Sequence, residues 1–198
     1  MTNQIMITLQ QIKDNDPCAG GWRKVLKANG GKSADFSKPF PVSSIIDSNA
    51  LEDTFWALGC LPEHDLLWRR YALWCALQVK DNTEDPRVHE CLETVERFCD
   101  GEATEDELEM AYSAAGAATW SAVGTVKELA THSAAYAAAQ SAEWSAQSAA
   151  EWSAADSAKW SALWSAAVKS VWSAVQSARS SQENKLREVL DTGACVLR

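Results

Sequence analysis

Residues 144–174 read WSAQSAAEWSAADSAKWSALWSAAVKSVWSA, and this repetitive stretch decides how the C-terminal half of the 198-residue chain folds. The word Trp-Ser-Ala occurs six times, and every spacing between successive words is a multiple of four residues. An α-helix turns by about 100° per residue, so a step of four residues overshoots one turn by about 40°. Indoles at this period wind around a helix, which therefore needs neighbours on several sides. The words begin at Trp120, Trp144, Trp152, Trp160, Trp164 and Trp172.

The repeats lie within an Ala/Ser-rich segment, residues 111–182, that contains 24 alanines, 15 serines and no proline. Alanine is the best helix former, and serine is tolerated where it faces water or a close neighbour. Thr104 and Glu107 match a capping box upstream of the segment, and Gly124 favours a break within it. We therefore predict an all-α fold of five to seven helices: a helical bundle with a very long Ala/Ser/Trp-rich helix or helical hairpin in the C-terminal half.

The tryptophans of the repeats allow three interpretations. In the first, the indoles pack against alanine and serine where helices approach closely, and each buried ring removes about 150–250 Å² from water. In the second, Trp144, Trp152 and Trp160 form an exposed surface for a partner or for a second copy of the chain, because a monomer rarely tolerates such an apolar patch. In the third, the Trp-Ser-Ala sequence multiplied by repeat slippage, and the spacing of its tryptophans has no function.

Two aspartate–proline pairs predict helix starts in the first part of the chain. Aspartate is a good N-cap, and proline fits the first helical position. Asp16-Pro17 accordingly predicts a helix over residues 18–28, and Asp85-Pro86 predicts a helix that ends at Asp100-Gly101.

Other elements of this part follow from caps, prolines and spacing. Asn49 and Glu52 match a capping box, and a further helix is expected over residues 62–80. Two prolines predict an extended loop over residues 38–42. The apolar residues between Ile5 and Ile12 have the spacing of one short helix.

The negative charge of the chain belongs to its first part. The whole chain has 18 Lys and Arg against 27 Asp and Glu, a formal net charge of -9. Residues 1–110 carry 11 basic and 20 acidic side chains, whereas the remainder carries seven of each. We therefore expect an acidic helical domain with an irregular N-terminal segment over residues 1–110. A helical segment over residues 111–182 packs on it, and residues 183–198 form a short helix and a frayed tail.

Acidic residues are densest between residues 85 and 109, where ten face only two arginines. Glu90, Glu93 and Glu96 form a row opposite the apolar positions of their predicted helix, and Glu105 and Asp106 begin the next helix. One interpretation is a solvated helix face that the helix dipole partly favours. The other is a docking face that steers a basic protein partner toward it.

The sequence contains no signature of catalysis, cofactor binding or metal binding. It lacks a glycine-rich phosphate loop, a G-x-S-x-G elbow and an H-E-x-x-H motif. Its six cysteines show no C-x-x-C pair and no zinc spacing. His89, Cys91 and Cys99 come nearest to a ligand cluster, and we interpret them as an exposed histidine beside two half-buried thiols.

Charge and hydropathy also limit the partners and the location that we expect. An acidic protein repels nucleic acid and anionic membranes, so we expect neither as a partner. The chain shows neither a secretory signal at its start nor the run of about 18–20 apolar residues that spans a membrane. We therefore expect a cytoplasmic protein.

Several phrases of the sequence together resemble one protein family. They are PCAGGW at residues 17–22, IDSNALED at residues 46–53, RYALWCA at residues 70–76, DPR at residues 85–87 and DGEAT at residues 100–104, followed by the Ala-rich tail. In these phrases, over most of residues 16–180, the chain is similar to immunity proteins encoded in bacterial and phage genomes. The resemblance implies an all-helical, non-enzymatic, cytoplasmic protein that binds and blocks a protein target.

We accordingly expect a non-enzymatic inhibitor of the immunity type, or a phage-encoded anti-defence protein, that sequesters its target by occluding a surface. One alternative is a structural protein that forms homo-oligomers through its Trp/Ala helices. Another is a small-ligand sponge, in which indoles between helices stack on a nucleotide base. The expected partner-binding residues are Glu90, Glu93, Glu96, Glu105, Asp106, Trp144, Trp152 and Trp160.

Overall fold

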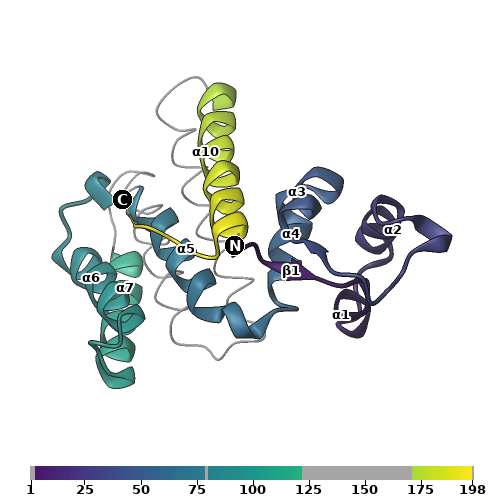
Figure 1. Cartoon of the computed structure of the whole chain (residues 1–198). Helices are drawn as coiled ribbons and strands as arrows, with labels where there is room; N and C mark the ends of the chain where they lie inside the picture. The colour runs from purple at the N-terminus through teal and green to yellow at the C-terminus, as the bar shows by residue number, and fades with distance from the viewer. Residues whose placement is uncertain (1–2, 79, 122–170, 198) are drawn as a thin grey trace.

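The computed structural model describes residues 3–78, 80–121 and 171–197, which form a mostly helical molecule (Figure 1). The all-α prediction is confirmed in these residues, where the strands form only one short two-stranded ribbon. The described residues contain eight α-helices, more than the five to seven expected. None of these helices combines the length and the hydropathy that a membrane span requires. The very long helix or hairpin is predicted mostly for residues 122–170, which lie outside the described residues.

Residues 3–49 are more regular than the sequence predicts. β1 and β2 pair in antiparallel fashion, with Met6 opposite Pro41 and Ile7 opposite Phe40. The loop predicted to be extended therefore lies against the N-terminal strand. The elements of this part are β1 (Met6–Ile7), α1 (Leu9–Asp14), α2 (Ala19–Ala28), the 3-10 turn η1 (Gly31–Ser33), β2 (Phe40–Pro41) and α3 (Ser43–Asn49).

Two of the predicted helix starts are displaced. The first helix, α1, begins only at Leu9, because Thr8 and Gln11 form a capping box in which Thr8 Oγ1 accepts the Gln11 N–H at 3.1 Å. Helix α2 is capped by Cys18 and not by Asp16, since the Cys18 sulfur accepts the N–H of Gly21 at 3.3 Å. Asp16 has a φ of 53° and lies in the turn before the helix.

The predicted capping box at Asn49 and Glu52 is wrong. Asn49 is the last residue of α3 and is buried. Its Nδ2 donates to the carbonyl of Gly21 and to Asp53 Oδ2, both at 2.9 Å. Ala50, with a φ of 76°, turns the chain into α4 (Leu51–Leu58) without a side-chain cap. The Asn49 amide therefore ties α3 to α2 and α4 instead of starting a helix.

Helices α6 and α7 begin where the sequence predicts, whereas the helix expected over residues 62–80 is shorter, because Pro62–His64 form a 3-10 turn and α5 covers only Asp65–Leu77. Asp85 caps α6 by accepting the N–H of Arg87 at 3.0 Å. The capping box before α7 is also confirmed, with Thr104 N–H to Glu107 Oε2 at 2.8 Å and Glu107 N–H to Thr104 Oγ1 at 3.2 Å. These elements are η2 (Pro62–His64), α5 (Asp65–Leu77), η3 (Lys80–Asn82), α6 (Pro86–Cys99) and α7 (Glu105–Ser121).

The C-terminal helix α10 (Val171–Thr192) is longer than the short helix that we expect near residue 183. The chain after α10 stays on the body of the molecule. Cys195 is buried, and Leu197 is partly buried against both hydrophobic clusters of the described residues. Figure 1 shows this tail crossing α5 toward α6 and α7.

Two hydrophobic cores share helix α5. The central core is built around Trp68 and Tyr71 of α5, with the N-terminal residues 5–58 on one side and Leu186 and Leu190 of α10 on another. The α6–α7 core uses the next face of α5 and is packed largely with small side chains. Its buried residues are Leu73, Ala76, Val88, Cys91, Leu92, Val95, Cys99, Leu108, Ala111, Ala115 and Ala118.

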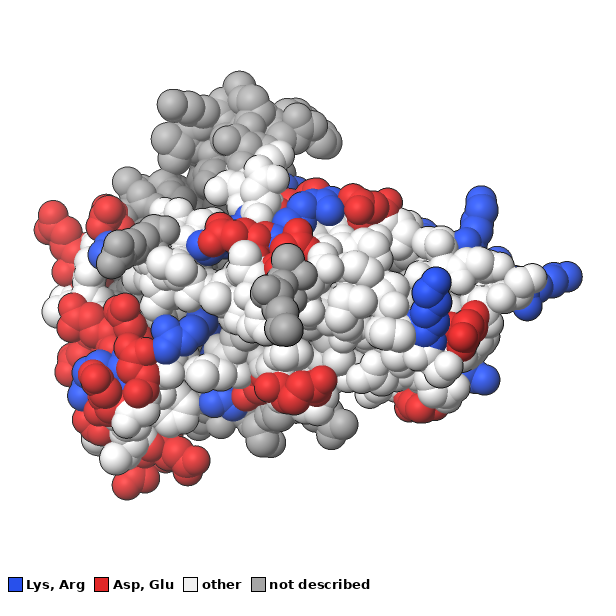
Figure 2. Space-filling view, viewed as in Figure 1, with Lys and Arg blue, Asp and Glu red and all other residues white. Residues whose placement is uncertain are grey.

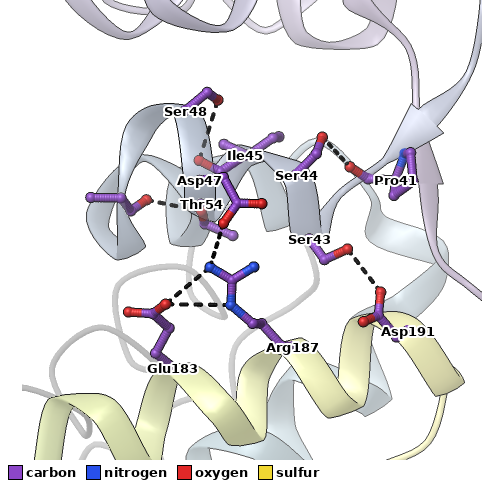
Figure 3. Close-up of polar contacts among 11 residues, drawn as sticks. Pro41, Ser43, Ser44, Ile45, Asp47, Ser48, Thr54, Glu183, Arg187 and Asp191 are labelled. Atoms are coloured by element: carbon purple, nitrogen blue, oxygen red, sulfur yellow. Dashed lines mark hydrogen bonds and ion pairs between the residues drawn. The ribbon is translucent and has the colours of Figure 1, made fainter. Parts of the chain in front are cut away.

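A polar seam joins α3 to α10 beside the central core (Figure 3). Arg187 Nη2 lies 2.7 Å from Asp47 Oδ1 and 3.0 Å from Glu183 Oε1. The hydrogen bond to Asp47 is the main reason that the pKa of Arg187 is raised. Asp191 accepts the Ser43 hydroxyl at 2.8 Å. Because the ion pairs are partly exposed, each contributes modestly to stability. The contacts of Arg187 with Asp47 and of Asp191 with Ser43 join α10 to α3.

Candidate partner-binding surface

Helix α6 separates its apolar and acidic residues onto opposite faces. Val88, Leu92 and Val95 are fully or almost fully buried and recur at spacings of three and four residues, so they share one face. Glu90, Glu93 and Glu96 lie outside this face and are exposed. The α6–α7 core therefore holds the three carboxylates outward on a rigid element.

The first turn of α7 adds further acidic side chains beside the end of α6. Glu105 and Asp106 are exposed. Glu107 is different, because it accepts hydrogen bonds from the N–H and the hydroxyl of Thr104 at 2.8 Å and 3.0 Å. These bonds, with a smaller contribution from Arg97, lower the pKa of Glu107. Glu107 thus caps the start of α7, whereas Glu105 and Asp106 remain exposed to solvent.

The arginines near this surface already have acidic partners. Arg87 forms its pair within the cap of α6, Arg97 reaches across to α7, and Arg70 comes from α5 and also donates to the carbonyl of Cys99 at 3.2 Å. Each arginine therefore neutralises one carboxylate. The pairs are Arg87–Asp85 at 2.7 Å, Arg97–Glu107 at 3.4 Å and Arg70–Asp100.

The remaining acidic residues have no cationic partner within the described part of the chain. Figure 2 shows their consequence: Asp and Glu gather at the end of the molecule that α6 and α7 form. Lys and Arg are more frequent at the opposite end, near α2, where Arg23, Lys24 and Lys27 are exposed. The unpaired acids, named here as the acidic surface, are Glu90, Glu93, Glu96, Glu102, Glu105, Asp106 and Glu109.

Five of the eight residues predicted to bind a partner belong to this acidic surface. The structure brings them onto two consecutive helices that pack against each other. The other three, Trp144, Trp152 and Trp160, lie outside the described residues, and a role for them stays a prediction.

The histidine and the cysteines of α6 form part of the packing. Burial raises the pKa of Cys91 to about 12 and that of Cys99 to about 11, so both are thiols at neutral pH and weak nucleophiles. Both are fully buried and not half-buried as expected. His89 is half-buried and not exposed, and its Nε2 lies 2.8 Å from the carbonyl of Thr83. Across the described ranges, no group of three or more His, Cys, Asp or Glu side chains could hold a metal ion.

Similarity to known proteins does not identify this surface. Comparisons with protein-family models, with curated proteins and with solved structures found no match to the chain. The interpretation therefore rests on the exposed carboxylates and on the packed helices that carry them.

Sequence reasoning missed a second feature, a cavity between α2, α3 and α4 that Trp22, Asp53 and Trp56 help to line. Its residues come from elements that are distant in sequence, so no spacing rule connects them. One local signal was present. Glycine is unfavourable in helices, yet Gly21 lies in the first turn of α2, where a Cβ would lie 3.2 Å from Asp53 Oδ2.

Proposed function

We propose that the protein is a non-enzymatic inhibitor that binds a basic surface of a protein target through the acidic surface of α6 and α7. The observation that carries the proposal is that seven exposed carboxylates, six on the two packed helices and Glu102 in the turn between them, have no cationic partner in the described part of the chain. Such a surface attracts a basic protein over a distance and accelerates its association. The buried faces of the same helices keep the carboxylates in place, which limits the entropy lost on binding.

The mode of action is inferred from the sequence phrases that resemble immunity proteins. A protein of that type works by occlusion: it covers the functional surface of its target and needs no chemistry of its own. The proposal therefore includes an immunity-type or anti-defence role in the cytoplasm, with neither nucleic acid nor a membrane as the partner. The net charge of -9 agrees with a basic protein target.

The experiment isolates binding proteins with the intact, tagged chain from a bacterial lysate at low salt. The test variant replaces Glu90, Glu93 and Glu96 with lysine. A matched control replaces Asp14, Glu63 and Asp81, which are also exposed, and so changes the net charge by the same amount at other positions. The proposal expects a protein that the wild type and the control retain and that the test variant releases.

The captured protein is then purified, identified and assayed with and without the chain. Its activity is expected to fall as one equivalent is added, and the complex is expected to weaken as salt is raised, because exposed charges are screened. A docking role for the acidic surface is contradicted if the wild type, the control and the test variant all retain the protein equally. It is also contradicted if the control and the test variant lose the protein to the same extent.

A second candidate role concerns the Ala/Ser/Trp-rich segment. On sequence grounds we retain the expectation of a very long helix or helical hairpin there, with Trp144, Trp152 and Trp160 available for a second copy of the chain. The helices α7 and α10, which flank residues 122–170, both contribute buried residues to the body. Sedimentation velocity over a wide range of concentrations tests this role, and a monomer throughout contradicts it.

A further inference from the structure

A cavity of about 130 Å³ lies between α2, α3 and α4. Its floor is formed by buried residues, of which Ile12, Val25, Ile45 and Ala57 are apolar. An apolar cavity of about 150 Å³ takes up benzene in another protein, so the volume here suits a small apolar body of about that size.

The mouth of the cavity has a different chemistry from its floor. Trp22 and Trp56 are half-buried there, and they flank the mouth together with the exposed Cys18. The Asp53 side chain is 32% exposed, which places its carboxylate where the cavity meets water. Indole rings and a carboxylate together attract cations, the rings through their electron-rich faces and the carboxylate through its charge.

The Asp53 carboxylate is held in place by its neighbours. Asn49 Nδ2 donates to Asp53 Oδ2 at 2.9 Å and to the carbonyl of Gly21 at the same distance. Asn49 is itself oriented, because its Oδ1 accepts the Ser48 hydroxyl at 2.7 Å. A Cβ at Gly21 would lie 3.2 Å from Asp53 Oδ2, so the glycine allows the carboxylate to approach the first turn of α2.

An ammonium group already approaches this carboxylate. Lys24 Nζ lies 3.7 Å from Asp53 Oδ2, and the lysine side chain is 56% exposed. A pair that is long and exposed contributes little, so a cation from solution can replace Lys24 at low cost. The position of Lys24 indicates that the mouth of the cavity favours a positive charge. Lys24 would also compete with a bound cation for Asp53, and a substitution can remove it.

We propose that this cavity binds a small primary amine whose apolar body is about the size of a benzene ring. The body occupies the floor, and the ammonium group pairs with Asp53 between Trp22 and Trp56. Because the cavity uses none of the residues of the acidic surface, the inference goes beyond the proposed function and does not depend on it.

The test titrates the intact chain with benzylamine and with benzyl alcohol, a neutral probe of nearly the same shape, by calorimetry at pH 7. Benzylamine is expected to bind about tenfold more tightly than benzyl alcohol, as a hydrogen bond to a charged group allows. Asp53→Asn keeps an oxygen that can accept from Asn49, and it is expected to abolish that difference. Lys24→Gln removes the competitor, and it is expected to strengthen benzylamine binding alone.

The exposed thiol of Cys18 supplies a second readout that requires no substitution. Its reaction with an aromatic disulfide reagent is expected to slow when benzylamine fills the cavity, whereas the buried thiols stay unreactive. Melting temperatures of the variants confirm that each one is folded. The proposal is overturned if benzylamine does not bind, if benzyl alcohol binds equally well, or if folded Asp53→Asn retains the preference for the amine.

Discussion

The central core and the α6–α7 core meet at helix α5 but are assembled in different ways. The central core joins residues from the beginning of the described chain to α10, and the N–H of Ile5 donates to the carbonyl of Leu190 at 2.8 Å. The α6–α7 core is made by two helices that follow each other in sequence, packed on Leu73 and Ala76 of α5. One core therefore depends on distant contacts, and the other on neighbouring ones.

This difference predicts how each part loses its structure. A unit of contacts that are local in sequence can open by itself, whereas a core formed by distant segments opens only when those segments separate together. The acidic surface lies on the local unit, and the amine cavity lies beside the core of distant contacts. We expect a substitution in the central core to leave the acidic surface intact, and a substitution in the α6–α7 core to leave the amine cavity intact, as long as the protein still folds.

The largest expected effects come from truncating one leucine in each core. Leu186 and Leu108 both have no exposed surface, and replacing either with alanine is expected to cost about 2–5 kcal/mol. Leu186→Ala is expected to lower hydrogen-exchange protection in α10 and in the N-terminal helices together. Leu108→Ala is expected to lower it mainly in α6 and α7. Uniform loss of protection in both variants contradicts the separation of the two cores.

A matched control for Leu186→Ala is Arg179→Ala on the same helix. Arg179 pairs with Glu52 at 2.8 Å, but both side chains are more than 60% exposed. Its removal is expected to cost less than about 1 kcal/mol, so a larger loss would show that α10 depends on its surface contacts.

Alkaline pH is expected to weaken both cores through their thiols. Burial raises the pKa of Cys75 and that of Cys91 from 9.0 to about 12. Between these values the folded thiol stays protonated while the unfolded one ionises, so stability is retained below pH 9 and falls as pH rises. The slope is about 1.4 kcal/mol per pH unit for each thiol. Urea unfolding from pH 8 to pH 11 measures it, and Cys75→Ala or Cys91→Ala is expected to flatten the profile.

A pair of glycines distinguishes the two cores at their turns. Gly193 follows α10 with a φ of 66°, and a Cβ there would lie 2.6 Å from the carbonyl oxygen of Asn3. Gly101 follows α6 with a φ of 76° and meets nothing within 4 Å. Gly101→Ala is expected to cost about 1–2 kcal/mol for its left-handed backbone. Gly193→Ala is expected to cost more, because Asn3 must also move, and equal urea midpoints would contradict that contact.

A small and local effect is expected at the start of α7. Thr104→Ala removes the hydroxyl of the capping box and is expected to cost about 1 kcal/mol. The pKa of Glu107 is expected to rise toward its ordinary value, because hydrogen bonds from Thr104 are the main reason it is lowered. Titration by NMR measures the change, and an unaltered Glu107 would show that its environment does not depend on the cap.

Prediction from sequence succeeded where the deciding contacts are local. Asp85 and Pro86 start α6, Thr104 and Glu107 start α7, and apolar spacing identifies the buried side of α6 correctly. The exposure of the acidic residues follows from the same spacing. Which acidic residues are paired could not be predicted from this spacing, because a partner can come from a different helix. Arg70 of α5, for example, pairs with Asp100.

Prediction failed where the deciding contacts are distant. Asn49 has the residue type of a cap, but its amide is used between α2 and α4. Asp16 resembles the cap of Asp85, yet Cys18 takes that position, because an aspartate–proline pair also suits a turn. The walls of the amine cavity come from several elements, and periodicity within one element cannot reveal them.

Helix α10 begins with the last of the six Trp-Ser-Ala words, and it supplies Leu186 and Leu190 to a core whose other buried residues come mostly from residues 5–75. During synthesis residues 5–75 leave the ribosome first, so the core remains incomplete until the whole repetitive segment has been translated. A frameshift within the repeats upstream of α10 would replace the sequence of this helix. The stability of the fold thus depends on in-frame translation through the repetitive segment.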